Sequence, residues 1–266
     1  MSRRLLSTGV VTRFPDRPDL QPVLDLLPKL AVDGFELSMY CGWDLEDAAQ
    51  RLSATSLQFV AAHCDKRIGA DLVLEPDRGL AAFAANCRLA EAVGAKLVVL
   101  HLWELPPGDR ELDRNLDVLP SLLDEADGHG LTLAVETLPG TAATPLENIR
   151  RAVERDERCR VTLDTEFLAF ADQLDAAFEE DWLWETGRVA HVHVKDWGGD
   201  LRDRNGLRRY LLPGEGVIDF EHVYGSLAER GYDGAMTLEI SALDVEGAVL
   251  PERLRAAEQW ARGGGA

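Results

Sequence analysis

Short apolar runs with strand character recur along the whole chain and alternate with segments of helical spacing. The intervening residues 78–95 and 116–130 are rich in helix formers, and each includes a late glycine where a helix commonly ends. Strand, helix, strand at this cadence, eight times, predicts an α/β fold, a (β/α)8 TIM barrel. A doubly wound open sheet is the alternative, but the count of eight favours closure. The eight runs are residues 5–11, 35–40, 59–64, 96–102, 131–137, 160–165, 189–196 and 235–241.

The last four runs alternate between apolar and polar positions. Side chains two residues apart in a strand share a face, so each run has one apolar face suited to the helix ring and one polar face suited to the barrel interior. Glu136, Asp164, His193 and Glu239 each fall on the polar face and late in their run. Because barrel active sites lie at the carboxyl ends of the strands, we expect these four side chains to converge there.

Three carboxylates and one imidazole at one rim predict a divalent-metal site. Buried carboxylates repel one another unless a cation offsets their charge. Carboxylate oxygens with one imidazole suit Mn²⁺, which we expect first, with Mg²⁺, Co²⁺ or Zn²⁺ as alternatives. The competing interpretation is a set of buried salt bridges to Lys195 or nearby arginines, but one cation for three acids does not balance.

Other polar and aromatic residues at the strand ends are candidates for substrate contact. His63 and His101 come near the ends of their runs, where they could contact substrate, bind metal or support a ligand, and we favour substrate contact. Lys195 faces the rim and would bind a substrate oxygen or compensate the carboxylates. Trp103 and Trp197 follow two of the runs and would wall a pocket or simply pack. His191 lies one layer deeper than His193 and either supports the site or only forms hydrogen bonds within the barrel.

Two loop features suggest anion binding without requiring it. Residues 213–216, with the sequence PGEG, form a turn whose backbone N–H groups could make an anion nest. Four arginines in the preceding loop would contact a substrate phosphate or merely aid solubility. These arginines are Arg202, Arg204, Arg208 and Arg209.

Length and composition fit a single enzyme domain. The 266 residues are close to the ~250 typical of one such barrel, and no linker divides them, so we expect one domain over residues 1–266. No apolar stretch reaches the ~20 residues of a membrane span. The first residues lack the apolar region of a signal peptide, and the four cysteines lack CxxC spacing, so we expect a reducing cytoplasm.

The charge balance bears on the partners. The chain has 28 basic and 47 acidic residues, a formal net charge of −19. Phosphate-backbone binding relies on lysine and arginine, so this balance argues against a nucleic-acid partner. We expect a small-molecule partner and no membrane partner, and a homo-oligomer stays open.

At this point the chain resembles the sugar phosphate isomerase/epimerase group of the xylose-isomerase-like TIM barrel superfamily, which includes ketose 3-epimerases and endonuclease IV. The segments that carry the resemblance are DGFELS, AAH, VVLH, AVET, LDT, HVHVKD, PGEGVIDF and TLEIS. The resemblance implies that Glu136, Asp164, His193 and Glu239 hold the metal. It also implies that Glu136 and Glu239 act as the acid/base pair on opposite sides of a bound sugar.

One position departs from the pattern of these relatives. They carry a histidine three residues beyond the strand-six aspartate, where this chain has Phe167 in DTEF. The resemblance implies that the histidine is a metal ligand in endonuclease IV and a substrate contact in the epimerases. Its loss argues against DNA repair and puts standard ketohexose 3-epimerisation in question. Glu166 would face away from the side of Asp164 if the strand continued.

The function predicted on these grounds is a metal-dependent isomerase or epimerase of a small sugar or hydroxy-carbonyl compound, working by proton abstraction and return through an enediolate. A second hypothesis is a lyase, a dehydratase of the inosose or dehydroshikimate type, which would expel water after the same abstraction. A third is a non-catalytic sugar-binding barrel. The intact set of four ligands argues against the third.

Overall fold

The structure is a computed structural model that describes residues 2–12, 19–40, 42–103, 109–185 and 187–264. Its eight strands form a closed parallel barrel in the order β1 to β8, so each strand neighbours the next one in the sequence. This confirms the predicted (β/α)8 TIM barrel. The strands are β1 (Arg3–Ser7), β2 (Phe35–Ser38), β3 (Phe59–His63), β4 (Leu97–Leu100), β5 (Thr132–Glu136), β6 (Arg160–Asp164), β7 (Val189–Val194) and β8 (Ala235–Leu238).

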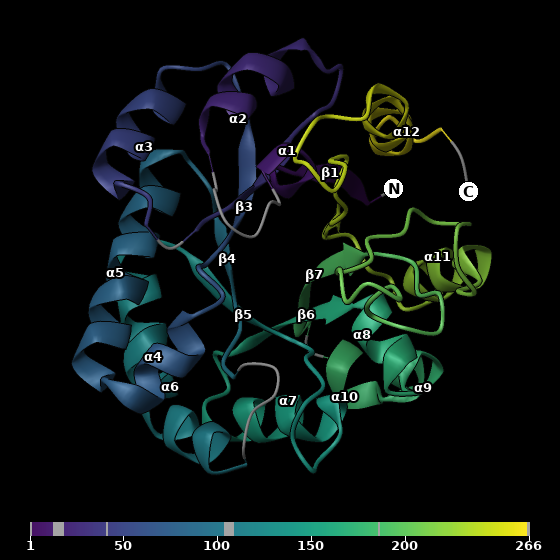
Figure 1. Ribbon diagram of the computed structural model, residues 1–266. Coiled ribbons are helices and arrows are strands. Elements are labelled where there is room, and N and C mark those ends of the chain that lie inside the picture. The colour runs from purple at the N-terminus through teal and green to yellow at the C-terminus, as the bar shows by residue number, and fades with distance from the viewer. Residues whose placement is uncertain (1, 13–18, 41, 104–108, 186, 265–266) are drawn as a thin grey trace. The chain divides into compact units, whose positions relative to one another are not determined.

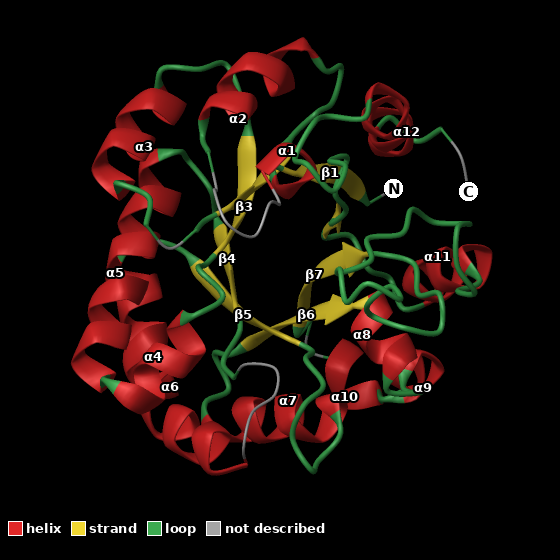
Figure 2. Ribbon diagram, in the orientation of Figure 1, coloured by secondary structure: helices red, strands yellow, loops and turns green. Residues whose placement is uncertain are grey.

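Helices occupy the connections between the strands, as Figure 2 shows in red. The helices are α1 (Gly9–Thr12), α2 (Gln21–Leu26), the 3-10 helix η1 (Leu27–Lys29), α3 (Leu45–Ser53), α4 (Ile68–Leu74), α5 (Pro76–Ala92), α6 (Asp109–Gly128), α7 (Pro145–Arg155), α8 (Thr165–Phe170), α9 (Leu174–Glu179), α10 (Asp181–Trp184), α11 (Phe220–Glu229) and α12 (Pro251–Ala261). Polar side chains begin several of them. Thr144 and Glu147 form a reciprocal capping box at α7, and Asp219 accepts from the backbone N–H of His222 at α11.

The chain falls into two compact units, one of residues 34–162 and one of residues 1–33 with 163–266. The first unit contains β2 to β5 and the start of β6 in parallel register, with Glu136 of β5 opposite Thr162. Figure 1 shows α3, α5 and α6 lying along one side of its strands. In the second unit, β8 pairs with both β1 and β7, with His193 opposite Thr237. The expectation of a single domain over residues 1–266 stays a prediction.

The first predicted strand was misplaced. Residues 5–11 were expected as a strand, but β1 ends at Ser7 and the short helix α1 takes over at Gly9. Local hydrogen bonds explain the turn, because the Ser7 hydroxyl accepts from the Gly9 N–H at 3.1 Å and the Thr12 hydroxyl donates to the Thr8 carbonyl at 3.0 Å. Hydroxyl side chains compete with a strand in this way. The other seven strands lie within their predicted runs and are up to three residues shorter.

The segment that carries His101 and Trp103 is held from two sides in its unit. Asn115 of α6 donates from its side-chain amide to the carbonyls of Gly69 at 2.8 Å and Leu102 at 2.6 Å. Gly69 of α4 packs directly on this segment, since a Cβ atom there would lie 2.7 Å from the His101 carbonyl oxygen. Only a residue without a side chain allows this approach.

The loop that follows β7 is fastened by one buried carboxylate, that of Asp196. It accepts four backbone N–H bonds, from Trp197 at 2.8 Å, Gly214 at 2.9 Å, Gly216 at 2.8 Å and Ile218 at 3.0 Å. The backbone N–H groups of the PGEG turn therefore bind a carboxylate of the protein itself. The anion nest expected in this turn has an internal occupant.

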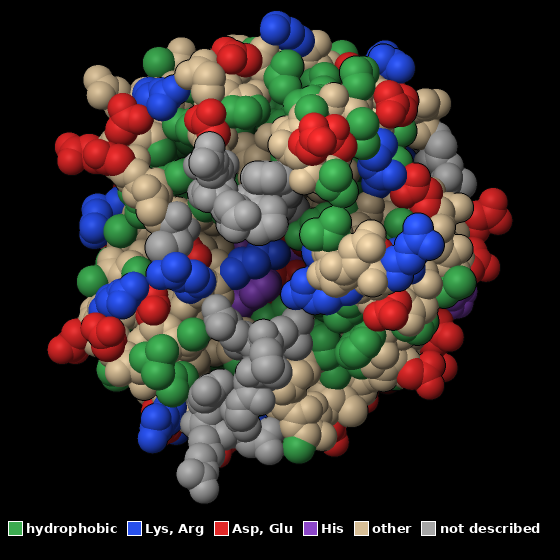
Figure 3. Space-filling model, viewed as in Figure 1, with side chains coloured by type: hydrophobic (Ala, Val, Ile, Leu, Met, Phe, Trp, Pro, Cys, Tyr) green, Lys and Arg blue, Asp and Glu red, His purple; other side chains and the backbone are tan. Residues whose placement is uncertain are grey.

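Three of the four cysteines, Cys64, Cys87 and Cys159, are free and buried. Burial raises the pKa of each thiol, in the case of Cys87 and Cys159 to about 12, so these thiols are poor nucleophiles at neutral pH. Among the described residues, no helix has the length and apolar character needed to cross a membrane. On the face drawn in Figure 3, acidic side chains are spread among basic ones.

The packing of Gly69 predicts the effect of adding one methyl group. Gly69→Ala should lower the free energy of unfolding by about 1–3 kcal/mol, because the new Cβ atom would overlap backbone atoms that cannot turn away. Gly128→Ala is the matched control, since nothing lies within 4 Å of a Cβ atom there. Urea denaturation of both variants tests this, and equal stability of the two would contradict it.

The Asp196 carboxylate should contribute more to the free energy of unfolding than its position in a loop suggests. In Asp196→Asn one oxygen becomes an NH₂ group that faces backbone donors, so we expect unfolding to become easier by about 2–4 kcal/mol. Asp200→Asn, at an exposed position of the same loop, should change stability little. Thermal denaturation provides the comparison, and a variant as stable as the Asp200 control would refute the fastening role.

Candidate metal centre

Three of the predicted metal ligands, Asp164, His193 and Glu239, belong to one of the two units. Asp164 ends β6, His193 lies in β7, and Glu239 directly follows β8. The backbone N–H of Glu239 still donates to the Val194 carbonyl at 3.1 Å, so its side chain keeps the alternation of β8. Strand alternation therefore puts the three side chains at one end of the strands, as predicted.

These three side chains form a buried cluster. All are 0% exposed, and one ligand atom of each can be chosen so that all lie within 4.8 Å of one another. His193 Nδ1 lies 3.9 Å from Asp164 Oδ2 and 3.8 Å from Glu239 Oε2. These distances are too long for hydrogen bonds. They suit ligands of one ion, because two atoms that each lie about 2.1 Å from a metal are about 3–4 Å apart.

Asp164 is oriented by the helix that begins after it. Its Oδ1 accepts from the Phe167 N–H at 2.9 Å and caps α8. The other oxygen, Oδ2, is thereby turned toward the cluster. A strand that ends directly in a capped helix thus fixes the carboxylate by backbone geometry.

The side chain of Lys195 is buried against the same carboxylates. Its Nζ lies 2.6 Å from Asp164 Oδ2 and donates to Glu239 Oε2. The backbone of Lys195 is held too, since its N–H donates to the Thr165 hydroxyl at 3.0 Å and its carbonyl accepts from the same hydroxyl at 2.7 Å. Of the two readings of Lys195 from the sequence, charge compensation is what the structure displays, and substrate binding stays a prediction.

The Phe167 position is enclosed by cations and by a buried acid. The ring lies 4.7 Å from Lys195 Nζ and 5.7 Å from the guanidinium of Arg208. Arg208 makes a two-pronged ion pair with Glu166, which is 1% exposed. The expectation that Glu166 faces away from the side of Asp164 was wrong. Two residues apart, the two side chains would share a face in a continued strand, and α8, which begins at Thr165, also leaves Glu166 buried. Arg208, considered from the sequence as a phosphate contact, is engaged by this acid.

The first histidine of the pair behaves as an internal residue. His191 is 1% exposed, and its Nε2 shares a hydrogen bond of 2.9 Å with the Thr237 hydroxyl on the neighbouring strand. Its ring meets that of His193 edge to face, with centroids 5.3 Å apart. Of the two roles considered for His191, the structure displays hydrogen bonding within the barrel, and support of the site stays a prediction.

The other unit holds a second buried cluster, made of Glu136, His63 and His101. Glu136 Oε2 lies 3.2 Å from His63 Nε2 and 2.6 Å from His101 Nε2, although the second contact is not aligned as a hydrogen bond. The two rings meet edge to face at 4.8 Å. Burial lowers the pKa of His101 to about 4 despite the opposing effect of Glu136, so this imidazole is neutral at neutral pH. One ligand atom of each of these three side chains can be chosen so that all lie within 4.8 Å of one another, close enough to hold a metal ion.

The two tryptophans differ in burial. Trp103 is fully buried, and Trp197 is half-buried. Neither indole N–H finds a hydrogen-bond partner among the described residues. Their assignment to a pocket wall stays a prediction.

Sequence reasoning misplaced Glu166 and gave no role to Thr165 or to the Asp196 carboxylate. A usable signal was present for the first two. Aspartate followed by threonine and glutamate is a typical helix start, which would have ended the strand at Asp164. Nothing local to Asp196 pointed to partners some twenty residues away.

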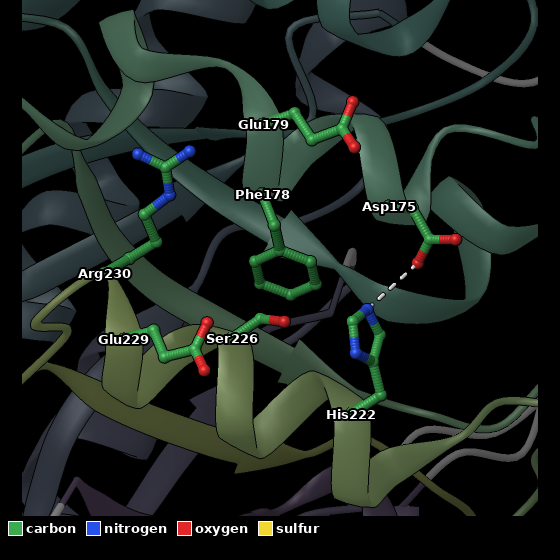
Figure 4. Close-up of a pocket in the computed structure, with 7 residues that line it drawn as sticks. All are labelled: Asp175, Phe178, Glu179, His222, Ser226, Glu229 and Arg230. Carbon is green, nitrogen blue, oxygen red and sulfur yellow. Dashed lines mark ion pairs between the residues drawn. The ribbon is translucent and has the colours of Figure 1, made fainter.

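A separate pocket of about 380 Å³ lies on the helices of the second unit, between α9 and α11. Figure 4 shows His222 of α11 pointing toward Asp175 of α9, at 3.4 Å, with the Phe178 ring between the two helices. None of the predicted site residues lines it.

The chain matches a known protein family over most of its length. The family model described as "Xylose isomerase-like TIM barrel" matches residues 24–262. Among curated proteins, the inosose dehydratase of Geobacillus thermodenitrificans is 27% identical over 190 residues, 59% of this chain and 61% of that protein. The inosose dehydratase of Serratia proteamaculans is 30% identical over 152 residues, which are 49% of this chain and 48% of that protein. The matched stretches thus span about half to three fifths of these relatives.

Solved structures resemble the chain over nearly its whole length. The 3-keto-D-glucoside 4-epimerase YcjR of E. coli has a TM-score of 0.71 at 19% identity and covers 99% of this chain and 100% of its own. The D-psicose 3-epimerase of Clostridium cellulolyticum has a TM-score of 0.69 at 14% sequence identity, and the match covers 98% of each chain. An IolI protein with a zinc atom has a TM-score of 0.66 at 17% sequence identity, and the match covers 98% of this chain and 95% of that one. At these identities the likeness concerns the fold, and the family model carries the assignment: the chain belongs to the xylose isomerase-like TIM barrel family.

Proposed function

We propose that this protein is a divalent-metal-dependent isomerase or epimerase of a small sugar or other hydroxy-carbonyl compound. The observation that carries the proposal is the buried cluster of Asp164, His193 and Glu239, whose mutual distances suit ligands of one ion. Asp164 and Glu239 are buried with one ammonium, that of Lys195, between them, so a divalent cation would complete their charge compensation.

Glu136 is proposed as the fourth ligand. The register of β5 and β6 supports this proposal, since Glu136 lies opposite Thr162. Thr162 and Asp164 are two residues apart in one strand and share a face, so the side chains of Glu136 and Asp164 are directed to the same side. The order of strands in the barrel supports bringing β5 to β8 together at their carboxyl ends.

The donor set bears on the identity of the metal. Three carboxylates and one imidazole suit Mn²⁺ first, with Mg²⁺, Co²⁺ and Zn²⁺ as alternatives. The zinc atom of the similar IolI protein supports a divalent ion in that fold. When bound, the cation would hold neighbouring carbonyl and hydroxyl oxygens of the substrate and lower the pKa of the C–H bond between them.

The remaining steps belong to side chains of the protein. One of Glu136 and Glu239 removes the proton from the carbon, and the other returns it, which for an epimerase happens on the opposite face. Substrate oxygens are bound by His63, His101 and Lys195, and Trp103 and Trp197 wall the pocket. Neutral His101 can donate a hydrogen bond to an oxygen that gains negative charge in the enediolate.

A dehydratase is the second candidate, favoured by the two inosose dehydratases to which the chain is similar. It begins with the same proton abstraction and differs in expelling a hydroxyl group as water. A histidine is absent at position 167, where the sequence resemblance leads one to expect a substrate contact of the ketose 3-epimerases. The two candidates therefore share the base and differ in the product.

The setting of the enzyme is also part of this proposal. We propose a cytoplasmic location, on the evidence of cysteines without paired spacing, and a small-molecule partner without nucleic acid, on the evidence of the net charge of −19. A homo-oligomer is compatible with the proposal and is not required by it.

Mn²⁺ binding tests the metal site. Protein stripped with EDTA should bind about one Mn²⁺ per chain by isothermal titration calorimetry and melt at a higher temperature when loaded. Asp164→Asn should weaken binding by about tenfold or more, because it removes a ligand charge, while asparagine still caps α8. The exposed Asp233→Asn variant should bind as the parent does. Tight binding by Asp164→Asn would exclude this residue as a ligand.

Proton exchange tests the acid/base assignment. In D₂O the parent enzyme should exchange the proton next to the carbonyl in one member of a panel of D-psicose, D-tagatose and an inosose, followed by NMR. Glu239→Gln should slow this exchange by about 10²–10⁴-fold, since the amide cannot take up the proton. Glu221→Gln, on the exposed surface of α11, should exchange normally. Exchange at the parent rate in Glu239→Gln refutes the role, and a product lacking one water identifies the dehydratase.

A further inference from the structure

The ion pairs around Lys195 join more acidic side chains than lysine and arginine side chains. In the described part of the chain, the ion pairs on this side join the acids Asp164, Glu239 and Glu166 to the side chains of Lys195 and Arg208. Arg208 is engaged by both oxygens of Glu166. The ammonium of Lys195, which is 1% exposed, pairs with two buried carboxylates, those of Asp164 and Glu239.

The oxygens that Lys195 contacts are the ones a metal would need. Asp164 Oδ1 accepts from the backbone of α8, which leaves Oδ2 to face the cluster, and it is Oδ2 that lies 2.6 Å from Lys195 Nζ. Glu239 offers Oε2 to Lys195, and the same Oε2 and Oδ2 lie nearest to His193 Nδ1. The ammonium and a divalent cation thus compete for one pair of oxygens, and they repel each other at such distances.

A second position for the Lys195 ammonium lies close to the first. Glu166 Oε2 lies 3.9 Å from Lys195 Nζ, and the face of the Phe167 ring lies 4.7 Å away. A carboxylate and an aromatic face both attract a lysine head group. A change in the side-chain torsions of Lys195 is enough to move it there, since its backbone is fixed by Thr165.

From this geometry we propose that Lys195 is an internal competitor for the metal. Its ammonium neutralises Asp164 and Glu239 until a divalent cation displaces it toward Glu166 and Phe167. The inference rests on the metal site proposed above and adds two consequences to it. The affinity for metal is lower than the donor set alone would give, and the lysine is presented to substrate once the metal is bound.

Neutral and charged substitutions of Lys195 separate competition from packing. Lys195→Met keeps most of the apolar stem and removes the charge, so its Kd for Mn²⁺ after EDTA stripping should fall by about tenfold or more. Lys195→Arg keeps the charge and should not bind more tightly than the parent. Lys29→Met, at an exposed lysine of η1, is the matched control and should leave the Kd unchanged.

Melting temperature gives a readout that a merely structural lysine would not produce. In EDTA, Lys195→Met should melt below the parent, since its carboxylates lack a counter-ion, and saturating Mn²⁺ should remove or reverse that difference. A structural lysine would lower both temperatures equally. If the variant is recovered only with Mn²⁺ in the buffer, its affinity is measured from the loaded side by competition with EDTA.

The outcomes distinguish this inference from the metal site itself. Mn²⁺ binding by the parent with an unchanged or weaker Kd in Lys195→Met overturns the competition alone. Equal tightening in Lys195→Arg overturns it as well. If neither the parent nor Lys195→Met binds Mn²⁺, the metal site falls and the inference falls with it.

Discussion

Carboxylates buried at the ends of strands are the constraint on which the rest of this site depends. Asp164 and Glu239 are fully buried, and each needs positive charge or hydrogen-bond donors to stay ionised. The protein supplies the ammonium of Lys195 to both and a backbone N–H from α8 to Asp164. This compensation combines one side-chain charge with one backbone dipole. Under the competition proposed above, a metal ion takes the place of the ammonium while the backbone donor keeps the ligand oriented.

Strand periodicity made much of this predictable from the sequence. A period of two places every second side chain on one face, so Asp164, His193 and Glu239 could be assigned to the interior without knowledge of the fold. The same periodicity separated His193 from His191, which hydrogen-bonds to Thr237 one layer deeper. These assignments held because each depends only on the residues of its own strand and on the direction in which parallel strands run.

Features that depend on where a strand stops, or on partners distant in the chain, escaped the sequence reasoning. Glu166 was assigned to the wrong side, since the period of two puts it with Asp164, and the capped helix that begins at Thr165 was not foreseen. Its pairing with Arg208 joins residues separated by a long loop, and the PGEG turn is held by Asp196 from far upstream. The error at β1 has the same origin, since hydroxyl groups of Ser7 and Thr12 decide the turn and alternation of apolar residues does not.

The central claim is that one divalent cation is held by Glu136, Asp164, His193 and Glu239. Anomalous diffraction at the manganese absorption edge, from crystals soaked in MnCl₂, tests it most directly. We expect a single strong peak within bonding distance of those four side chains, with the Lys195 ammonium no longer on Asp164 and Glu239. A peak elsewhere, or no peak in a crystal where Lys195 still bridges the two carboxylates, would contradict it.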